Sequence, residues 1–103
     1  MDIAISKNGI PIRLTEERWL HISLGHPEIA DYYYEILDTI EEPEIIYKGN
    51  YDSLITVGFK HKISGKFLVV VYKETSQTDG FVITAYISNK LNLFSKKTIL
   101  WKQ

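Results

Sequence analysis

The chain has 103 residues, of which 45% are hydrophobic and 24% charged, and its formal net charge is −1. This length predicts one domain, residues 1–103, with a single small core. Because the chain has no cysteine, disulfide scaffolds and thiolate zinc sites are excluded. The near-zero net charge gives no support by itself for a nucleic-acid partner.

Charge is divided unevenly along the sequence. Residues 1–54 hold four lysine or arginine residues and eleven acidic ones, whereas residues 55–103 hold eight lysines and two acidic residues. This division predicts one acidic and one basic surface, and the basic surface suits a polyanion. The alternative is that helices carry glutamate, while exposed strands carry lysine to discourage edge-to-edge aggregation. Both interpretations stay open.

The first part of the chain predicts a short edge strand followed by two helices. Residues 10–14 alternate in polarity and include a proline, which suits a sheet edge. Thr15 is a good N-cap for a first helix that Gly25 should end. A second helix is expected to begin at residues 26–28 and to stop before Pro43. Its apolar stripe would be Ile29, Tyr33, Ile36, Leu37 and Ile40.

The second half of the chain predicts an antiparallel meander. Strands are expected at 45–47, 54–60, 67–72 and 81–87, and the third is apolar on both faces and therefore central. Residues 98–101 are ambiguous and could form a last strand. This order predicts an α+β domain in which two N-terminal helices pack on one face of a roughly four-stranded antiparallel sheet.

Histidine and hydroxyl side chains supply the candidate chemistry. His21 and His26 lie five residues apart, and histidine titrates nearest to neutral pH, which suits proton transfer. Thr84 and Tyr86 are two residues apart, so on a strand they share a face, expected to be the one that the helices leave open. The alternatives are ordinary structural roles: packing for His21, helix capping for His26, and solvated strand positions for the two hydroxyls.

Three lysines, Lys60, Lys66 and Lys73, lie on or beside neighbouring predicted strands. If they reach the face of Thr84 and Tyr86, ammonium and hydroxyl groups would surround one cavity suited to a phosphodiester. A metal centre is not predicted, because histidines at i and i+5 do not share a helix face and no third ligand is evident. No glycine-rich phosphate-binding motif occurs, so no nucleotide cofactor is expected.

Five short segments follow one another in an order and spacing typical of one group of nucleases. They read LTEERWLHI at 14–22, HPE at 26–28, IEEPEII at 40–46, KFLVVV at 66–71 and VITAY at 82–86. On these segments the chain resembles the phage-associated nucleases of the barnase, EndoU, colicin and RelE-like group. The resemblance covers roughly residues 11–88.

The resemblance implies N-terminal helices on a four-stranded antiparallel sheet. It also implies metal-independent RNA cleavage by internal transesterification, leaving a 2′,3′-cyclic phosphate. His21 would be the general acid or base, Thr84 and Tyr86 would bind or protonate the phosphate, and His26 would have a less defined role. Members of this group act as toxins, so the implied partners are RNA and a cognate antitoxin or immunity protein. The acidic first half departs from the basic surface usual in such toxins.

The sequence therefore predicts a small toxin-like endoribonuclease that needs no metal or other cofactor. A cytoplasmic location is expected, because the N-terminus lacks a basic region followed by an apolar stretch. No membrane partner is expected, because the apolar runs are far too short to span a bilayer. The alternative is a non-catalytic module of the same fold that binds a protein or a nucleic acid.

Overall fold

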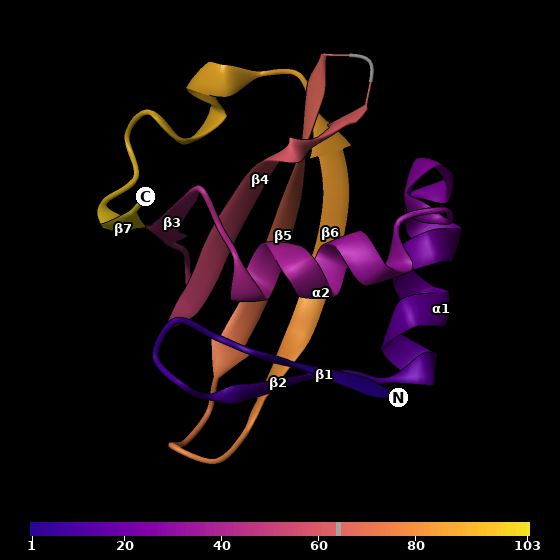
Figure 1. Cartoon of the computed structure of the whole chain (residues 1–103), viewed down its shortest axis with the longest axis vertical. Helices are drawn as coiled ribbons and strands as arrows, with labels where there is room; N and C mark the ends of the chain where they lie inside the picture. Colours follow the sequence, from indigo (N-terminus) through magenta and orange to yellow (C-terminus); the bar gives the residue numbers. More distant parts are fainter. Residues whose placement is uncertain (64) are drawn as a thin grey trace.

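The computed structural model describes residues 1–63 and 65–103, without the side chains of residues 60–63 and 91. The described chain is α+β, with two α-helices and a seven-stranded mixed sheet of order β1-β2-β6-β5-β4-β3-β7 (Figure 1). The expectation of a roughly four-stranded antiparallel sheet beside two N-terminal helices is therefore wrong. The sheet is larger, and one of its pairings is parallel.

Four strands of the sheet form an antiparallel meander in the second half of the chain. They are β3 (Ile45–Lys48), β4 (Ser53–Ile63), β5 (Lys66–Glu74) and β6 (Gly80–Ser88). Three short strands extend the sheet on both sides: β1 (Asp2–Ile5), β2 (Pro11–Leu14) and β7 (Ile99–Lys102).

Two of the added strands lie where the sequence indicated a strand: β2 matches the short strand expected at 10–14, and β7 lies at the ambiguous segment 98–101. Local patterns did not indicate β1 or the pairing of these strands with the meander. β2 runs parallel to β6 and pairs with it only through Ile12 with Gly80 and Arg13 with Phe81. The Arg13 guanidinium fixes this junction by two hydrogen bonds to the Asp79 carboxylate, of 2.8 and 3.0 Å. Those bonds also lower the pKa of Asp79. Pairing between such distant segments depends on the whole fold rather than on either segment.

The helices begin and end for local reasons that the sequence signals only in part. Helix α1 (Glu16–Gly25) begins after Thr15, whose Oγ1 accepts a hydrogen bond of 3.1 Å from the Arg18 backbone N–H, so the predicted N-cap is confirmed. The expected helix start at residues 26–28 is wrong. Pro27 instead opens a short 3₁₀ helix, η1 (Pro27–Ile29), and α2 (Tyr33–Glu41) follows after a turn.

The two faces of the sheet carry two separate apolar clusters. Helix α2 crosses one face, here called the helix face (Figure 1), where the fully buried residues Ile36 and Ile40 pack with sheet residues such as Leu68 and Val70. The opposite face, here called the far face, carries a smaller cluster that is partly covered by the 3₁₀ helix η2 (Leu91–Phe94). Its members are Ile45, Ile55, Val57, Phe67, Val69 and Phe94.

A bulge in β6 decides which of its side chains reach each face. Val71 of β5 pairs with Thr84, but the next residue, Tyr72, pairs with Val82, so Ile83 is one extra residue. Val82 and Ala85 are buried on the helix face. A strict alternation along β6 would place Ile83 on the same face as Ala85, and the bulge prevents this. Thr84 does share the far face with Tyr86, since its partner Val71 packs there.

Candidate functional site on the far face

Helix α1 takes the place of a strand along the outer edge of β6. Because β2 pairs with β6 only at Gly80 and Phe81, the described chain places no strand beside the rest of that edge. Both α1 and η1 pack against β6 there, as Figure 1 shows for α1. Side chains from α1 can therefore border the far face next to Thr84 and Tyr86.

The direction of His21 follows from that of Trp19. The Trp19 ring meets the Tyr33 ring of α2 edge to face, with the centroids 5.0 Å apart, so Trp19 points toward the helix-face side. His21 is two residues further on, which is about 200° around an α-helix. It therefore points away from Tyr33 of α2. His21 is exposed, as a residue that meets a substrate needs to be.

Arg18 accompanies His21 on the same side of α1. The two residues are three apart, which makes them neighbours on a helix surface. With Thr15 and Glu17 they line a shallow depression of about 300 Å³. Sequence reasoning did not select Arg18, although its spacing from His21 was visible. A guanidinium beside an imidazole is suited to holding a phosphate oxygen next to a proton carrier.

The structure brings His26 to Tyr86. Their ring centroids are 5.8 Å apart with an angle of 34° between the planes. Nδ1 of His26 lies 3.4 Å from a carboxylate oxygen of Glu28, which restricts the orientation of the imidazole. Burial raises the pKa of Tyr86. A tyrosine phenol is protonated at neutral pH in any case, so Tyr86 can donate a hydrogen bond.

Thr84 and Tyr86 belong to a row of three half-buried hydroxyls. The third is Ser88, which pairs with the far-face residue Phe67 and whose Oγ accepts a hydrogen bond of 3.1 Å from the backbone N–H of Lys90. Sequence reasoning did not select Ser88 as a site residue. The period of two in Thr84-Ala85-Tyr86-Ile87-Ser88 was the available signal.

The three predicted lysines do not converge. Lys73 pairs with Phe81 and Ser53 and lines a far-face cavity close to Thr84. Lys66 is exposed at the opposite end of β5. It comes directly before the far-face residue Phe67, so its side chain points to the other face of the sheet and does not join this site. The side chain of Lys60 lies outside the described residues.

A cavity of about 570 Å³ adjoins the hydroxyl row. Its β6 wall consists of Phe81 and Ile83, which come just before Thr84 on the same strand. The other lining residues come from β4, β5, the β3–β4 turn and the segment after η2: Asn50, Tyr51, Ser53, Ile55, Val71, Lys73 and Lys97. The cavity thus combines an apolar interior with two ammonium groups.

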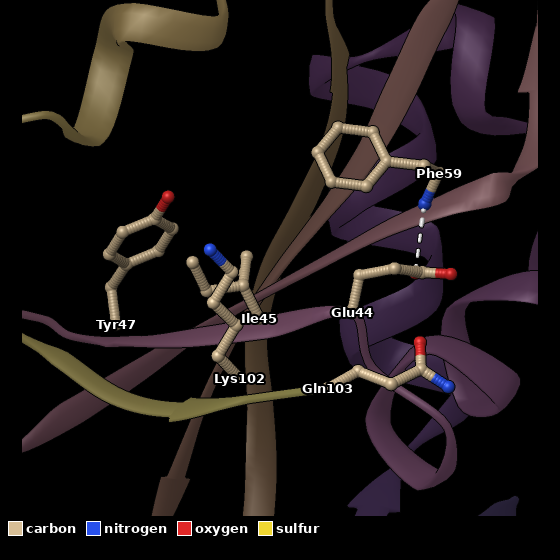
Figure 2. Close-up of a pocket in the computed structure, with 6 residues that line it drawn as sticks. All are labelled: Glu44, Ile45, Tyr47, Phe59, Lys102 and Gln103. Carbon is tan, nitrogen blue, oxygen red and sulfur yellow. Dashed lines mark hydrogen bonds between the residues drawn. The ribbon is translucent and has the colours of Figure 1, made fainter.

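A second hollow of about 390 Å³ lies between β3, β4 and β7 (Figure 2). Its carboxylate, Glu44, already accepts a hydrogen bond of 3.0 Å from the Phe59 backbone N–H, drawn as the dashed line in Figure 2. None of the predicted site residues lines this hollow. The other residues around it are Ile45, Tyr47, Lys102 and Gln103.

Comparisons of the chain with protein-family models, curated proteins and solved structures find no match. The described residues contain no group of three or more His, Asp or Glu side chains placed to hold a metal ion. No helix in the described part of the chain is long and apolar enough to cross a membrane. The candidate site is therefore judged on its own geometry.

Proposed function

We propose that this protein is a small endoribonuclease that cleaves RNA without a metal ion, as a toxin or a stress nuclease. One observation carries the proposal. His21 and Arg18 line one depression on α1, α1 packs against β6, and β6 carries Thr84 and Tyr86 on one face. An acid–base group, a cation and two hydroxyl donors are the parts that such a reaction needs.

The reaction would be an internal transesterification. His21 takes the proton of the ribose 2′-hydroxyl, the 2′-oxygen attacks phosphorus, and the bond from phosphorus to the 5′-oxygen breaks. A protonated group returns a proton to that 5′-oxygen, so the products are a 2′,3′-cyclic phosphate and a 5′-hydroxyl. The proton that His21 takes from the 2′-hydroxyl is the one that the 5′-oxygen needs, so the same imidazole can act first as base and then as acid.

The remaining groups would hold the phosphate and its developing charge. Arg18 can present two parallel N–H groups to phosphate oxygens. The Tyr86 phenol would donate a hydrogen bond to the same group, and the Thr84 hydroxyl would add another. His26 contacts the Tyr86 ring rather than the open depression, which favours a positioning role.

The decisive experiment is incubation of the purified protein with total RNA in excess EDTA. Wild type is compared with His21→Ala and with His61→Ala, a control that removes an imidazole the proposal does not use. We expect cleavage by wild type and by the control, and its loss in His21→Ala, with cyclic-phosphate ends on the fragments. Cleavage by His21→Ala at the wild-type rate would refute the assigned role.

Expression in bacteria tests the biological part of the proposal. An active toxin should slow growth in the absence of a cognate antitoxin or immunity protein, and His21→Ala should relieve the effect. RNA that stays intact with every protein would instead favour the non-catalytic binding module.

A further inference from the structure

The turn between β3 and β4 holds a tyrosine in an unfavourable backbone conformation. Tyr51 and Asp52 have φ values of 54° and 62°, and the Ser53 backbone N–H donates to the Asn50 carbonyl at 3.0 Å. Two successive positive φ angles define the mirror-image hairpin turn that Asn-Gly normally occupies. A bulky side chain at its first central position is uncommon.

Burial does not explain this tyrosine, because Tyr51 is 92% exposed. Residues held in such backbone conformations cluster at active sites and ligand contacts, so this exposed ring is a candidate ligand contact. The ring lines the far-face cavity of about 570 Å³ described above. That size falls within the range of small-molecule sites.

The charges around the cavity favour an anionic occupant. Lys73 of β5 and Lys97 after η2 both line it, and no acidic side chain of the described residues does. The Lys97 ammonium donates to Oδ1 of Asn50 at 3.3 Å, which ties the segment after η2 to the strained turn. Phe81 and Ile83 supply an apolar wall on the opposite side.

We propose that this cavity binds one nucleotide of single-stranded RNA beside the scissile phosphate. The base stacks on Tyr51 against the apolar wall, and Lys73 and Lys97 hold the neighbouring phosphate. Phe81 and Thr84 are separated by at most about 10 Å along β6, so one strand connects the subsite to the hydroxyl row. This inference rests on the proposed ribonuclease function.

The test measures binding separately from cleavage. A short fluorescein-labelled RNA with 2′-O-methyl groups cannot be cleaved by transesterification, and its anisotropy reports the Kd in EDTA. Tyr51→Asn removes the ring and suits the turn better than tyrosine, so it is expected to fold. Lys97→Ala removes one ammonium. Tyr34→Ala and Lys96→Ala, which change exposed residues outside the cavity, are the matched controls.

We expect Tyr51→Asn to raise the Kd by about 5- to 150-fold, the range for loss of one base–aromatic stack. Lys97→Ala should raise the Kd and flatten its salt dependence. The controls should bind as wild type does. Unchanged affinity in Tyr51→Asn, or no binding by wild type, would overturn the inference.

The outcomes also separate this subsite from the proposed function. If wild type cleaves RNA but Tyr51→Asn binds normally, the subsite is wrong and the nuclease stands. If wild type binds through Tyr51 and never cleaves RNA, the nuclease is wrong and the cavity is the site of a binding module.

Discussion

The two faces of the sheet differ in how completely they are closed. On the helix face, even the buried threonines are satisfied internally: Oγ1 of Thr56 donates to the Thr39 carbonyl at 3.0 Å, and Oγ1 of Thr39 donates to the Glu35 carbonyl at 2.8 Å. The far face has a smaller apolar cluster, half-buried hydroxyls and the largest cavity described above.

This difference indicates a division of tasks within a small domain. Full burial of apolar side chains supplies most of the stability of a fold. A site for a polar substrate needs accessible hydroxyl and cationic groups, which contribute little to that stability. Substitutions on the helix face should therefore change unfolding, and substitutions around the far face should change activity.

The largest effect is expected for His21→Ala on RNA cleavage. Loss of a general acid–base group lowers the rate by about 10²- to 10⁴-fold. Because His21 is exposed, the thermal unfolding midpoint of the His21→Ala variant should stay close to that of wild type. Cleavage kinetics and a melting curve on the same preparation check both statements. Unfolding of the variant would show that His21 belongs to the structure instead.

Ile36→Ala should test the closed face of the sheet. Ile36 is fully buried between α2 and the sheet, and such a truncation costs about 2–5 kcal/mol of unfolding free energy. Ile83→Ala changes the half-buried bulge residue that lines the far-face cavity, and it should lower the unfolding free energy by about 1 kcal/mol or less. Urea denaturation of both variants gives the comparison. Equal losses would contradict the proposed division between the faces.

Gly58→Ala probes how closely α2 approaches the sheet. A methyl group at Gly58 would lie 2.8 Å from Oγ1 of the buried Thr39, and relieving that contact should cost about 1–3 kcal/mol. Gly25→Ala is the control, because nothing lies within 4 Å of the added carbon and alanine favours a helix. We expect the control to be neutral or slightly stabilising in the same denaturation assay.

The smallest expected effect is a change in how the free energy of unfolding depends on high pH through Tyr33. Burial and a hydrogen bond of 2.7 Å to the Asp2 carboxylate raise the pKa of Tyr33 from 10.0 to about 12. The folded protein therefore holds this proton more tightly than the unfolded chain does. The contribution of Tyr33 to the free energy of unfolding is complete below pH 10 and is lost as the pH rises toward 12.

Tyr33→Phe removes this titration, so the fall in unfolding free energy between pH 9 and about pH 11.5 should be shallower than in wild type. Tyr51→Phe, which changes an exposed ring in the turn between β3 and β4, should keep the wild-type slope. Chemical denaturation across that range is the measurement. Parallel slopes in wild type and Tyr33→Phe would refute the link to Tyr33.

The sequence alone determined the features that depend on neighbouring residues. Thr15 caps α1 because its hydroxyl is three residues from the orphan N–H of Arg18, and the central meander follows from apolar strands separated by turns. The shared face of Thr84 and Tyr86 follows from their spacing of two. The roles of His21, Thr84 and Tyr86 stay predictions.

Only the tertiary structure decided the features that join distant segments. The parallel contact of Ile12 with Gly80 gives the sheet its mixed character, and the bulge at Ile83 sets which β6 side chains reach each face. The contact of the His26 and Tyr86 rings depends on α1 lying along the free edge of β6. Such pairings reflect the packing of the whole chain, so local composition and periodicity carry no signal for them.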